Sequence, residues 1–244
     1  MPPTLILIRH AEAYHNLTKN WELPDPALSP LGEKQCIDLR EQLKREPLTK
    51  EIEVIVSSPF RRTLQTTVIG LSDVIGRGVG VEVDGSWQEN AVKPCDTGSE
   101  PSVISKDFPS IDFSPLKPPY PQKKGPYAFT RAAVLARGQS ALKSLYHRPE
   151  KVIAVVSHSA FLRTAVTHRR FANADYRIFE FEDVKEGGEF RLKEWKETDE
   201  KGGGMGWSEK GEAGIMEDDF EDDVSEESGK AEGPDGEADG QIPV

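Results

Sequence analysis

The sequence has few of the features that mark secreted, membrane-embedded or metal-clustered proteins. Only two of its 244 residues are cysteine, so no disulfide framework is expected, and a reducing compartment, the cytoplasm, is predicted. No apolar run approaches the ~18 residues that a membrane span needs, and the first run, 4–8, is too short for the core of a signal peptide. Residues 1–196 hold no cluster of His, Cys, Asp and Glu at metal-ligand spacing, so we expect neither a metal nor a cofactor.

Positive charge is also scarce, but only in one part of the chain. There are 31 Lys and Arg against 42 Asp and Glu, a formal net charge of −11. Residues 197–244 contribute 17 acidic and 3 basic residues, a net of −14, which leaves a net of +3 for residues 1–196. A body at +3 without a basic stretch interleaved with aromatic residues gives no case for nucleic-acid binding. The body and the acidic end therefore need separate explanations.

The acidic end is poor in the residues that build a core. Residues 197–244 include ten glycines and few large apolar side chains, so they cannot bury enough surface to offset the entropy of ordering. We predict a disordered tail there. It serves either as a solubilising segment, as a docking motif for a protein partner around Ile215, Met216 and Phe220, or as a weak competitor for a basic pocket.

The body alternates apolar, β-branched runs with helical patterns, which predicts one three-layer α/β/α domain over residues 1–196 with a mostly parallel central sheet. The expected strands are 4–8, 52–56, 80–83 and 152–156, with a closing hairpin made by 178–181 and 190–195. The expected helices are 31–45, 60–71, 127–146 and 160–167. On the first helix, Leu31, Ile37, Leu39 and Leu43 are expected near one face.

One segment of the body, residues 90–126, fits neither pattern. It contains eight of the 18 prolines, scattered lysines and little periodicity. An irregular insertion of this length in a compact domain is usually functional or disordered. We interpret it as a lid over the strand ends, where its lysines favour an anionic ligand and Phe108, Phe113, Tyr120 and Tyr127 leave room for a bulkier one.

Polar clusters follow the predicted strands: Arg9-His10 after the first, Ser57 to Arg62 after the second, and Ser157-His158-Ser159 after the third. Each cluster alone has a simpler explanation, as a surface pair, a solvated helix face or a structural histidine. In an open α/β sheet, however, ligands bind at the carboxyl ends of the strands. Helix N-termini and arginines at that edge favour an anion, so we expect these residues and Glu89 to converge on one site.

Five motifs in this order resemble the histidine phosphatase superfamily, the phosphoglycerate mutase-like group. They are Leu7-Ile8-Arg9-His10-Ala11-Glu12 with Asn16, the segment 28–35, the segment 57–66, Glu89, and Val156-Ser157-His158-Ser159. The combination of Glu89 with Pro94-Cys95-Asp96-Thr97-Gly98 is most similar to a fungal branch of the group.

The resemblance implies a phosphoglycerate mutase-like fold and a role for each motif residue. His10 would be the nucleophile that becomes phosphohistidine, and Arg9, Arg62 and His158 would hold the phosphoryl oxygens. Glu89 would give a proton to the leaving oxygen and then take one from water. The substrate-binding residues would be Asn16, Ser159 and the lid residue Lys93.

This set of residues suits the chemistry of phosphoryl transfer. Charge spreads over the oxygens of the transferring group, and two guanidiniums and an imidazolium supply positive charge without a metal. The nucleophile His10 must be neutral while His158 does more as a cation, so we expect neighbouring charges to separate their pKa values.

Two positions favour hydrolysis over transfer. Mutases of the group carry Ser three places after the nucleophile and Arg-His-Tyr-Gly after the acid, whereas this chain has Ala13 and Asn90-Ala91-Val92-Lys93. The sequence therefore predicts a phosphatase acting on a small phosphorylated metabolite. The alternatives are a phosphoglycerate mutase-type phosphotransferase and, from a different class, a non-catalytic phosphate-binding module.

Overall fold

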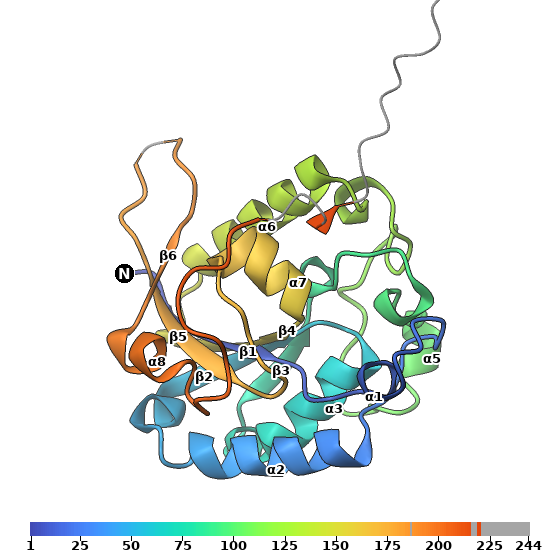
Figure 1. Cartoon of the computed structure of the whole chain (residues 1–244), viewed down its shortest axis with the longest axis horizontal. Helices are drawn as coiled ribbons and strands as arrows, with labels where there is room; N and C mark the ends of the chain where they lie inside the picture. Colours follow the sequence, from blue (N-terminus) through green and yellow to red (C-terminus); the bar gives the residue numbers. More distant parts are fainter. Residues whose placement is uncertain (186, 216–218, 221–244) are drawn as a thin grey trace, which may run out of the picture.

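A computed structural model describes residues 1–185, 187–215 and 219–220 of the chain. Their central element is a six-stranded sheet with the order β3-β2-β4-β1-β5-β6 (Figure 1). The first four strands are parallel, and the last two form the predicted antiparallel hairpin. The strands are β1 (Thr4–Arg9), β2 (Ile52–Ser57), β3 (Gly80–Val83), β4 (Val152–Ser157), β5 (Tyr176–Phe181) and β6 (Leu192–Glu194).

Helices cover both faces of this sheet. The α-helices are α1 (Tyr14–Thr18), α2 (Pro30–Leu43), α3 (Arg61–Gly70), α4 (Ser72–Gly76), α5 (Pro101–Ile104), α6 (Arg131–Tyr146), α7 (Ser159–Phe161) and α8 (Lys196–Lys201). The helix α7 continues as a π-helix, η5 (Leu162–Thr167), and the short 3-10 helices are η1 (Pro47–Glu51), η2 (Gly85–Trp87), η3 (Pro94–Asp96) and η4 (Gly125–Tyr127). None of the helices in the described ranges is long and apolar enough to cross a membrane.

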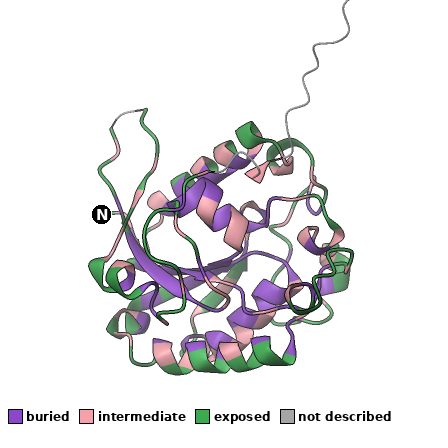
Figure 2. Cartoon of the chain, in the orientation of Figure 1, coloured by how far each residue is buried: buried purple, intermediate pink, exposed green. Residues whose placement is uncertain are grey.

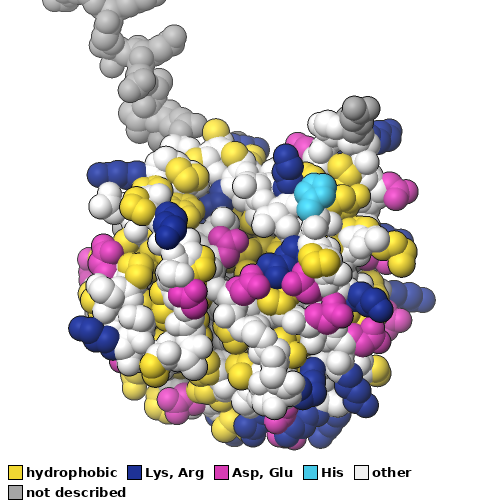
Figure 3. Space-filling view, turned by 180° about the vertical axis from the view of Figure 1, so that it is seen from behind, with side chains coloured by type: hydrophobic (Ala, Val, Ile, Leu, Met, Phe, Trp, Pro, Cys, Tyr) yellow, Lys and Arg dark blue, Asp and Glu magenta, His cyan; other side chains and the backbone are white. Residues whose placement is uncertain are grey.

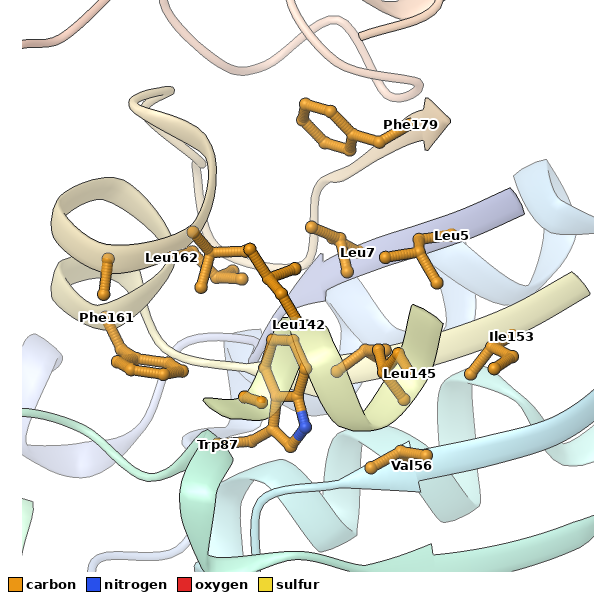
Figure 4. Packing of buried hydrophobic residues seen from close by; sticks show 14 of the residues in the cluster. Leu5, Leu7, Val56, Trp87, Leu142, Leu145, Ile153, Phe161, Leu162 and Phe179 are labelled. Carbon is orange, nitrogen blue, oxygen red and sulfur yellow. The ribbon is translucent and has the colours of Figure 1, made fainter. Parts of the chain in front are cut away.

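The strands β1, β2, β4 and β5 divide their side chains between two hydrophobic layers. On β1, Leu5 and Leu7 face the layer that contains Leu142 and Leu145 of α6 (Figure 4). Ile6 and Ile8 face the opposite layer, with Cys36, Leu39 and Leu43 of α2. The buried sheet thus lies between two helical layers (Figure 2), and the predicted three-layer α/β/α fold is confirmed.

Only two of the four residues predicted on the apolar face of the first long helix are buried. Leu39 and Leu43 are buried, but Leu31 and Ile37 are exposed at 50% and 44%. The buried positions of α2 are Gly32, Cys36, Leu39 and Leu43, which follow the 3.6-residue period. Gly32 belongs to this set because a Cβ there would lie 1.9 Å from the carbonyl oxygen of Glu12.

Residues 90–126 lie over the carboxyl ends of the strands and have a small core of their own. Ile104, Phe108, Ile111 and Phe113 form a third hydrophobic cluster with Leu64 and Val83. Phe108 and Phe113 therefore stabilise the insertion and do not face a substrate. We call this segment the lid.

The predicted disorder of the acidic end is wrong for residues 197–215. Residues 196–201 form α8, and the chain then runs past buried Asp175, whose carboxylate accepts hydrogen bonds from the N–H groups of Met205 and Trp207 and from the Ser208 hydroxyl. Three glycines with positive φ, Gly202, Gly203 and Gly206, allow this close path.

The ordered part of the chain therefore extends past residue 196. Composition alone predicted disorder there. It does not show that the buried carboxylate of Asp175 binds the backbone of this glycine-rich stretch. Phe220 packs 6.2 Å from the ring of Phe129, so one residue of the proposed docking motif has an intramolecular contact. Met216 and residues 221–244 lie outside the described residues.

Candidate active site

The strand ends bring the predicted catalytic residues together. His10 follows β1, Glu89 follows η2, and His158 follows β4, which pairs with both β1 and β2. The ring centroids of His10 and His158 are 5.1 Å apart. His10, Arg62, Glu89 and His158 are at most 9% exposed, and the lid contacts Arg62 through Cys95 and Glu89 through Lys123.

His10 is oriented by hydrogen bonds at both ring nitrogens. Its Nδ1 lies 2.7 Å from the carbonyl oxygen of Ala11, so Nδ1 carries the hydrogen and Nε2 keeps a lone pair. Arg62 donates from Nε to this Nε2 at 3.2 Å. Burial, followed by the charges of Arg62 and Arg9, holds the pKa of His10 well below 6.5. The imidazole is therefore neutral and its lone pair faces the enclosed site, as a nucleophile requires.

Arg62 connects His10 with the lid. It is the second residue of α3 and is 1% exposed. Besides its bond to His10, its guanidinium donates to the carbonyl oxygen of Cys95 and, from Nη2, to Oδ1 of Asp96 at 3.1 Å. The neighbouring Arg61 pairs with Asp107 on the outside, so one of the two adjacent arginines faces the site and the other faces solvent.

Arg9 supplies a second guanidinium. Its Nη1 donates to the carbonyl oxygen of Phe171 at 2.8 Å, whereas its buried Nε has no hydrogen-bond partner in the described part of the chain. Burial lowers the pKa of Arg9 to about 10, which leaves it charged near neutral pH. The unpaired Nε–H is thus available to an anion.

His158 is held by Ser58 and leaves one ring nitrogen free. The Ser58 hydroxyl lies 2.8 Å from Nε2 of His158, and the buried Nδ1 has no partner among the described residues. Burial and the charge of Arg62 hold the pKa of His158 well below 6.5. The pKa of His158 is thus shifted in the same direction as that of His10, not toward the cation that the sequence suggested, because both imidazoles share the same burial and the same neighbouring cation.

Glu89 lies at the first turn of α7. Its Oε1 accepts from the N–H groups of Asn90 and Phe161, each at 3.0 Å, and its Oε2 accepts from the N–H of Ala160 at 3.2 Å. These bonds fix the carboxylate in one orientation within the buried site.

Two basic residues to which the sequence assigned no individual role form hydrogen bonds with residues 88–90, around Glu89. Lys123 of the lid donates from Nζ to the carbonyl oxygen of Glu89, and burial holds its pKa well below 10.5. Arg137 of α6 donates to the carbonyl oxygen of Gln88 at 2.6 Å and to Oδ1 of Asn90 at 2.7 Å.

Of these two residues, only Arg137 could have been predicted from the sequence pattern. Arg137 shares the buried face of α6 with Val134, Gly138 and Ala141, and a charge on an apolar face indicates a buried partner. Lys123 lies in the aperiodic lid, where the pattern gives no signal.

The three predicted substrate-binding residues lie on α1, on α7 and in the lid. Asn16 is used locally, since its Oδ1 accepts from the N–H of Ala13. Ser159 is the first residue of α7. Lys93 is exposed, with its ammonium 5.6 Å from the centre of the Trp21 ring, so the structure does not bring it into the cluster around His10.

His15 lies between His10 and Trp21. Its ring centroid is 6.1 Å from that of His10 and 5.7 Å from that of Trp21. Burial, reinforced by the charges of Arg62 and Arg9, lowers the pKa of His15 to about 3.

Cys95 of the lid is buried, and burial raises the pKa of its thiol to about 12. Within the described ranges, no group of three or more His, Cys, Asp or Glu side chains is placed to hold a metal ion.

One face of the molecule shows no concentration of basic side chains among the described residues. On the face shown in Figure 3, basic and acidic side chains are interspersed. The guanidinium groups of Arg9, Arg62 and Arg137 are buried instead, where low dielectric strengthens their attraction for an anion.

Comparisons with known proteins agree with this geometry. The family model of the histidine phosphatase superfamily (branch 1) matches residues 5–184. Phosphoglycerate mutase-like protein 1 of Arabidopsis thaliana is 33% identical over 194 residues, covering 65% of this chain and 69% of that protein. A probable phosphatase of Schizosaccharomyces pombe is 31% identical over 165 residues, covering 66% and 76%. The chain belongs to the histidine phosphatase superfamily.

Solved structures show the same fold. A putative α-ribazole-5′-P phosphatase from Escherichia coli superposes with a TM-score of 0.52 at 19% identity, covering 79% of this chain and 96% of that one. YhfR of Bacillus stearothermophilus gives a TM-score of 0.51 at 22% identity, covering 78% and 95%. Family membership supports the predicted enzyme class, a phosphoric monoester hydrolase.

Proposed function

We propose that this protein is a phosphatase that hydrolyses a small phosphorylated metabolite through a phosphohistidine on His10, without a metal. The observation that carries the proposal is the orientation of one imidazole. Nδ1 of His10 is bound to the carbonyl oxygen of Ala11, which directs the Nε2 lone pair toward Arg62 and the enclosed cations.

The first step forms a bond between Nε2 of His10 and phosphorus while the bond from phosphorus to the leaving oxygen breaks. Arg62 and Arg9 face the phosphoryl oxygens with N–H groups, and the free Nδ1 of His158 adds a further contact. The arriving phosphate dianion stabilises a proton on His158, in opposition to the burial and the charge of Arg62 that lower the pKa of this imidazole.

The proton balance needs a carboxyl group. Glu89 gives a proton to the leaving oxygen, so the alcohol departs neutral. In the second step a water attacks phosphorus, Glu89 takes a proton from that water, and the bond to Nε2 breaks. The products are inorganic phosphate and the regenerated enzyme.

The wall of the site favours water over a second phosphorylated acceptor. Ala13 is buried and has no hydroxyl with which to bind an acceptor. Asn90 is occupied by Arg137 and by the Thr164 hydroxyl at 3.0 Å. Enclosure of the catalytic cluster by the lid supports a small substrate, with Asn16, Ser159 and Lys93 as contacts at its outer end. A cytoplasmic location, a fungal origin and a protein partner of the acidic end stay predictions.

The test compares His10→Ala with His147→Ala on a panel of phosphorylated metabolites. His147 is exposed at the end of α6, so its variant controls for loss of a histidine. We expect His10→Ala to lose turnover and the phosphoenzyme together, while His147→Ala keeps both. Turnover retained by His10→Ala would contradict the mechanism.

The products separate the remaining alternatives. Release of inorganic phosphate supports the phosphatase, whereas an isomer of the substrate would indicate a mutase. If the wild-type protein binds phosphate but never becomes labelled by a reactive phosphodonor, it is a non-catalytic binding module.

A further inference from the structure

Asp25 is a buried carboxylate outside the cluster around His10, and it binds two separate segments of the chain. It lies in the loop between α1 and α2 and is 4% exposed. Its Oδ1 accepts from the N–H of Arg61 at 3.0 Å, and its Oδ2 accepts from the N–H and the hydroxyl of Ser99 at 3.2 Å and 2.7 Å. Both oxygens therefore form hydrogen bonds, which are stronger to a carboxylate than to a neutral acceptor.

The first of these segments is the start of α3, where Arg62 is the second residue. The first N–H groups of a helix have no partner within the helix, and the N-cap residue Phe60 offers no side-chain acceptor. Asp25 supplies that acceptor from a distant part of the sequence, and its negative charge suits the positive end of the helix dipole. The carboxylate thus fixes the backbone from which the Arg62 side chain extends.

The second segment is the part of the lid that receives the Arg62 guanidinium. Arg62 donates to the carbonyl oxygen of Cys95 and to Oδ1 of Asp96. Ser99, which lies three residues after Asp96, is bound to Asp25 through both its N–H and its hydroxyl. One carboxylate therefore connects the helix that carries Arg62 with the loop that carries its two acceptors.

The backbone of Asp25 adopts an unfavourable conformation while it makes these contacts. Its φ is +36°, in the left-handed region that few residues other than glycine adopt. Its N–H donates to the carbonyl oxygen of Pro94 at 3.4 Å, and the N–H of Cys95 donates to the carbonyl oxygen of Trp21 at 3.2 Å. Residues 94–99 of the lid are thus bound at both ends to the loop that contains Asp25. Such a backbone conformation persists only where the surrounding structure enforces it, and it is common at functional sites.

Asp107 is a lid carboxylate that contacts the same helix in a different way. It binds the side chain of Arg61, and its own side chain is 49% exposed. Because this pair lies on the outside, its loss should not move Arg62. Asp107→Asn is therefore a matched control for Asp25→Asn.

We propose that Asp25 is a positioning residue, which sets the direction of the Arg62 guanidinium by fixing the start of α3 and residues 94–99 of the lid relative to each other. The partners of Asp25 are Arg61, Ser99 and Pro94, so it acts through Arg62 and contacts no reacting atom. The inference rests on the proposed function and deepens it, because Arg62 has to direct its N–H groups at the phosphoryl oxygens. Binding of phosphate through two N–H groups is sensitive to small displacements of the guanidinium.

The test is a double-mutant cycle between Asp25→Asn and Arg62→Gln, with 4-nitrophenyl phosphate as the substrate. Asparagine keeps one oxygen for the N–H of Arg61 but cannot also accept both bonds from Ser99. We expect Asp25→Asn to lower kcat/KM by about 30-fold when Arg62 is intact and by less than about threefold in the Arg62→Gln background. A residue that only stabilises the fold would lower kcat/KM by the same factor in both backgrounds.

Ser99→Ala removes a lid bond of Asp25 and leaves the cap of α3 in place, so it tests the inference even if Asp25→Asn fails to fold. It should lower kcat/KM by about fivefold when Arg62 is intact and have little effect in the Arg62→Gln background. Asp107→Asn should stay within about twofold of its parent in both backgrounds.

The same cycle is measured on the affinity for inorganic phosphate by calorimetry, which needs no turnover. Equal factors in the two backgrounds would overturn the inference, and so would wild-type activity and affinity in both Asp25→Asn and Ser99→Ala. If the wild-type protein shows neither turnover nor phosphohistidine, the proposed function fails, and the phosphate affinities still decide whether Asp25 acts through Arg62. Failure of the one proposal is therefore distinguishable from failure of the other.

Discussion

Nε of Arg62 and Nε2 of His10 are 3.2 Å apart, which places a buried, fixed cation directly against the lone pair of the nucleophile. Burial and the charge of Arg62 lower the pKa of His10, and the same guanidinium has N–H groups that could bind a phosphoryl oxygen. The proposed mechanism therefore depends on both the charge and the geometry of this contact.

Arg62→Lys tests the geometry at constant charge. Lysine cannot contact His10, Cys95 and Asp96 at once as the planar guanidinium does. We expect kcat/KM to fall by about 100-fold in steady-state assays. Arg61→Lys on the outside of the same helix is the control, and an equal loss there would show that the effect is not specific to the site.

The pH dependence of kcat/KM tests the electrostatics. Since burial and the charges of Arg62 and Arg9 lower the pKa of His10, activity governed by this group should persist well below pH 6.5 and fall only under more acidic conditions. Arg62→Gln removes one of these charges, so its residual activity should begin to fall at a higher pH than that of the wild type. Superimposable profiles after scaling would argue against the assignment.

Stability should also depend on pH through His15. Its folded pKa of about 3 lies below the unfolded value of 6.5, so the unfolded chain binds more protons and stability is lost as pH falls below 6.5. Between pH 7 and pH 5 this group accounts for about 2 kcal/mol of the decrease in the free energy of unfolding. Urea unfolding of His15→Asn should show a decrease smaller by that amount, and a decrease equal to that of the wild type would contradict the assignment.

Arg137→Met tests whether the buried arginine of α6 positions Glu89. It removes donors from the carbonyl of Gln88 and the side chain of Asn90 on either side of Glu89, so we expect kcat to fall more than KM rises. Loss of these bonds should also cost about 3 kcal/mol of stability. Lys143→Met at an exposed position of the same helix should change neither quantity, and a purely structural Arg137 would lower the melting temperature while leaving kcat unchanged.

Two truncations test the revised boundary of the domain. Removal of all residues after Lys196 deletes most of α8 and the donors to Asp175, so Tm should fall by more than about 5 °C in a thermal melt. Removal of residues 221–244 keeps every described contact and should leave Tm, KM and the salt dependence of KM unchanged. A raised affinity for substrate in the shorter deletion would instead support competition between the acidic end and the substrate.

The sheet was predictable because its strands are short, apolar and β-branched, and because each ends in a distinct polar cluster. The same clusters identified His10, Arg62 and His158, since parallel strands align their carboxyl ends. The face of α2 was harder to predict, because Gly32 marks the buried side although it has no side chain.

The lid residues could not be predicted in the same way. Lys123 and Asp96 reach the site through an aperiodic segment whose path depends on its small core of Ile104, Phe108, Ile111 and Phe113. Lys93 has the same charge as Lys123 and is nearer in sequence to Glu89, yet it lies outside the cluster. Composition likewise could not reveal that Asp175 orders the glycine-rich chain after α8.

The central claim is that the phosphoryl group is carried on Nε2 of His10. The direct measurement is to quench the wild-type enzyme during turnover of a labelled phosphomonoester and map the attached phosphate by mass spectrometry under alkaline conditions, which preserve phosphohistidine. We predict an alkali-stable, acid-labile phosphate on His10 that disappears as inorganic phosphate is released. Phosphate on another residue, or turnover at full rate with His10 never modified, would contradict the account.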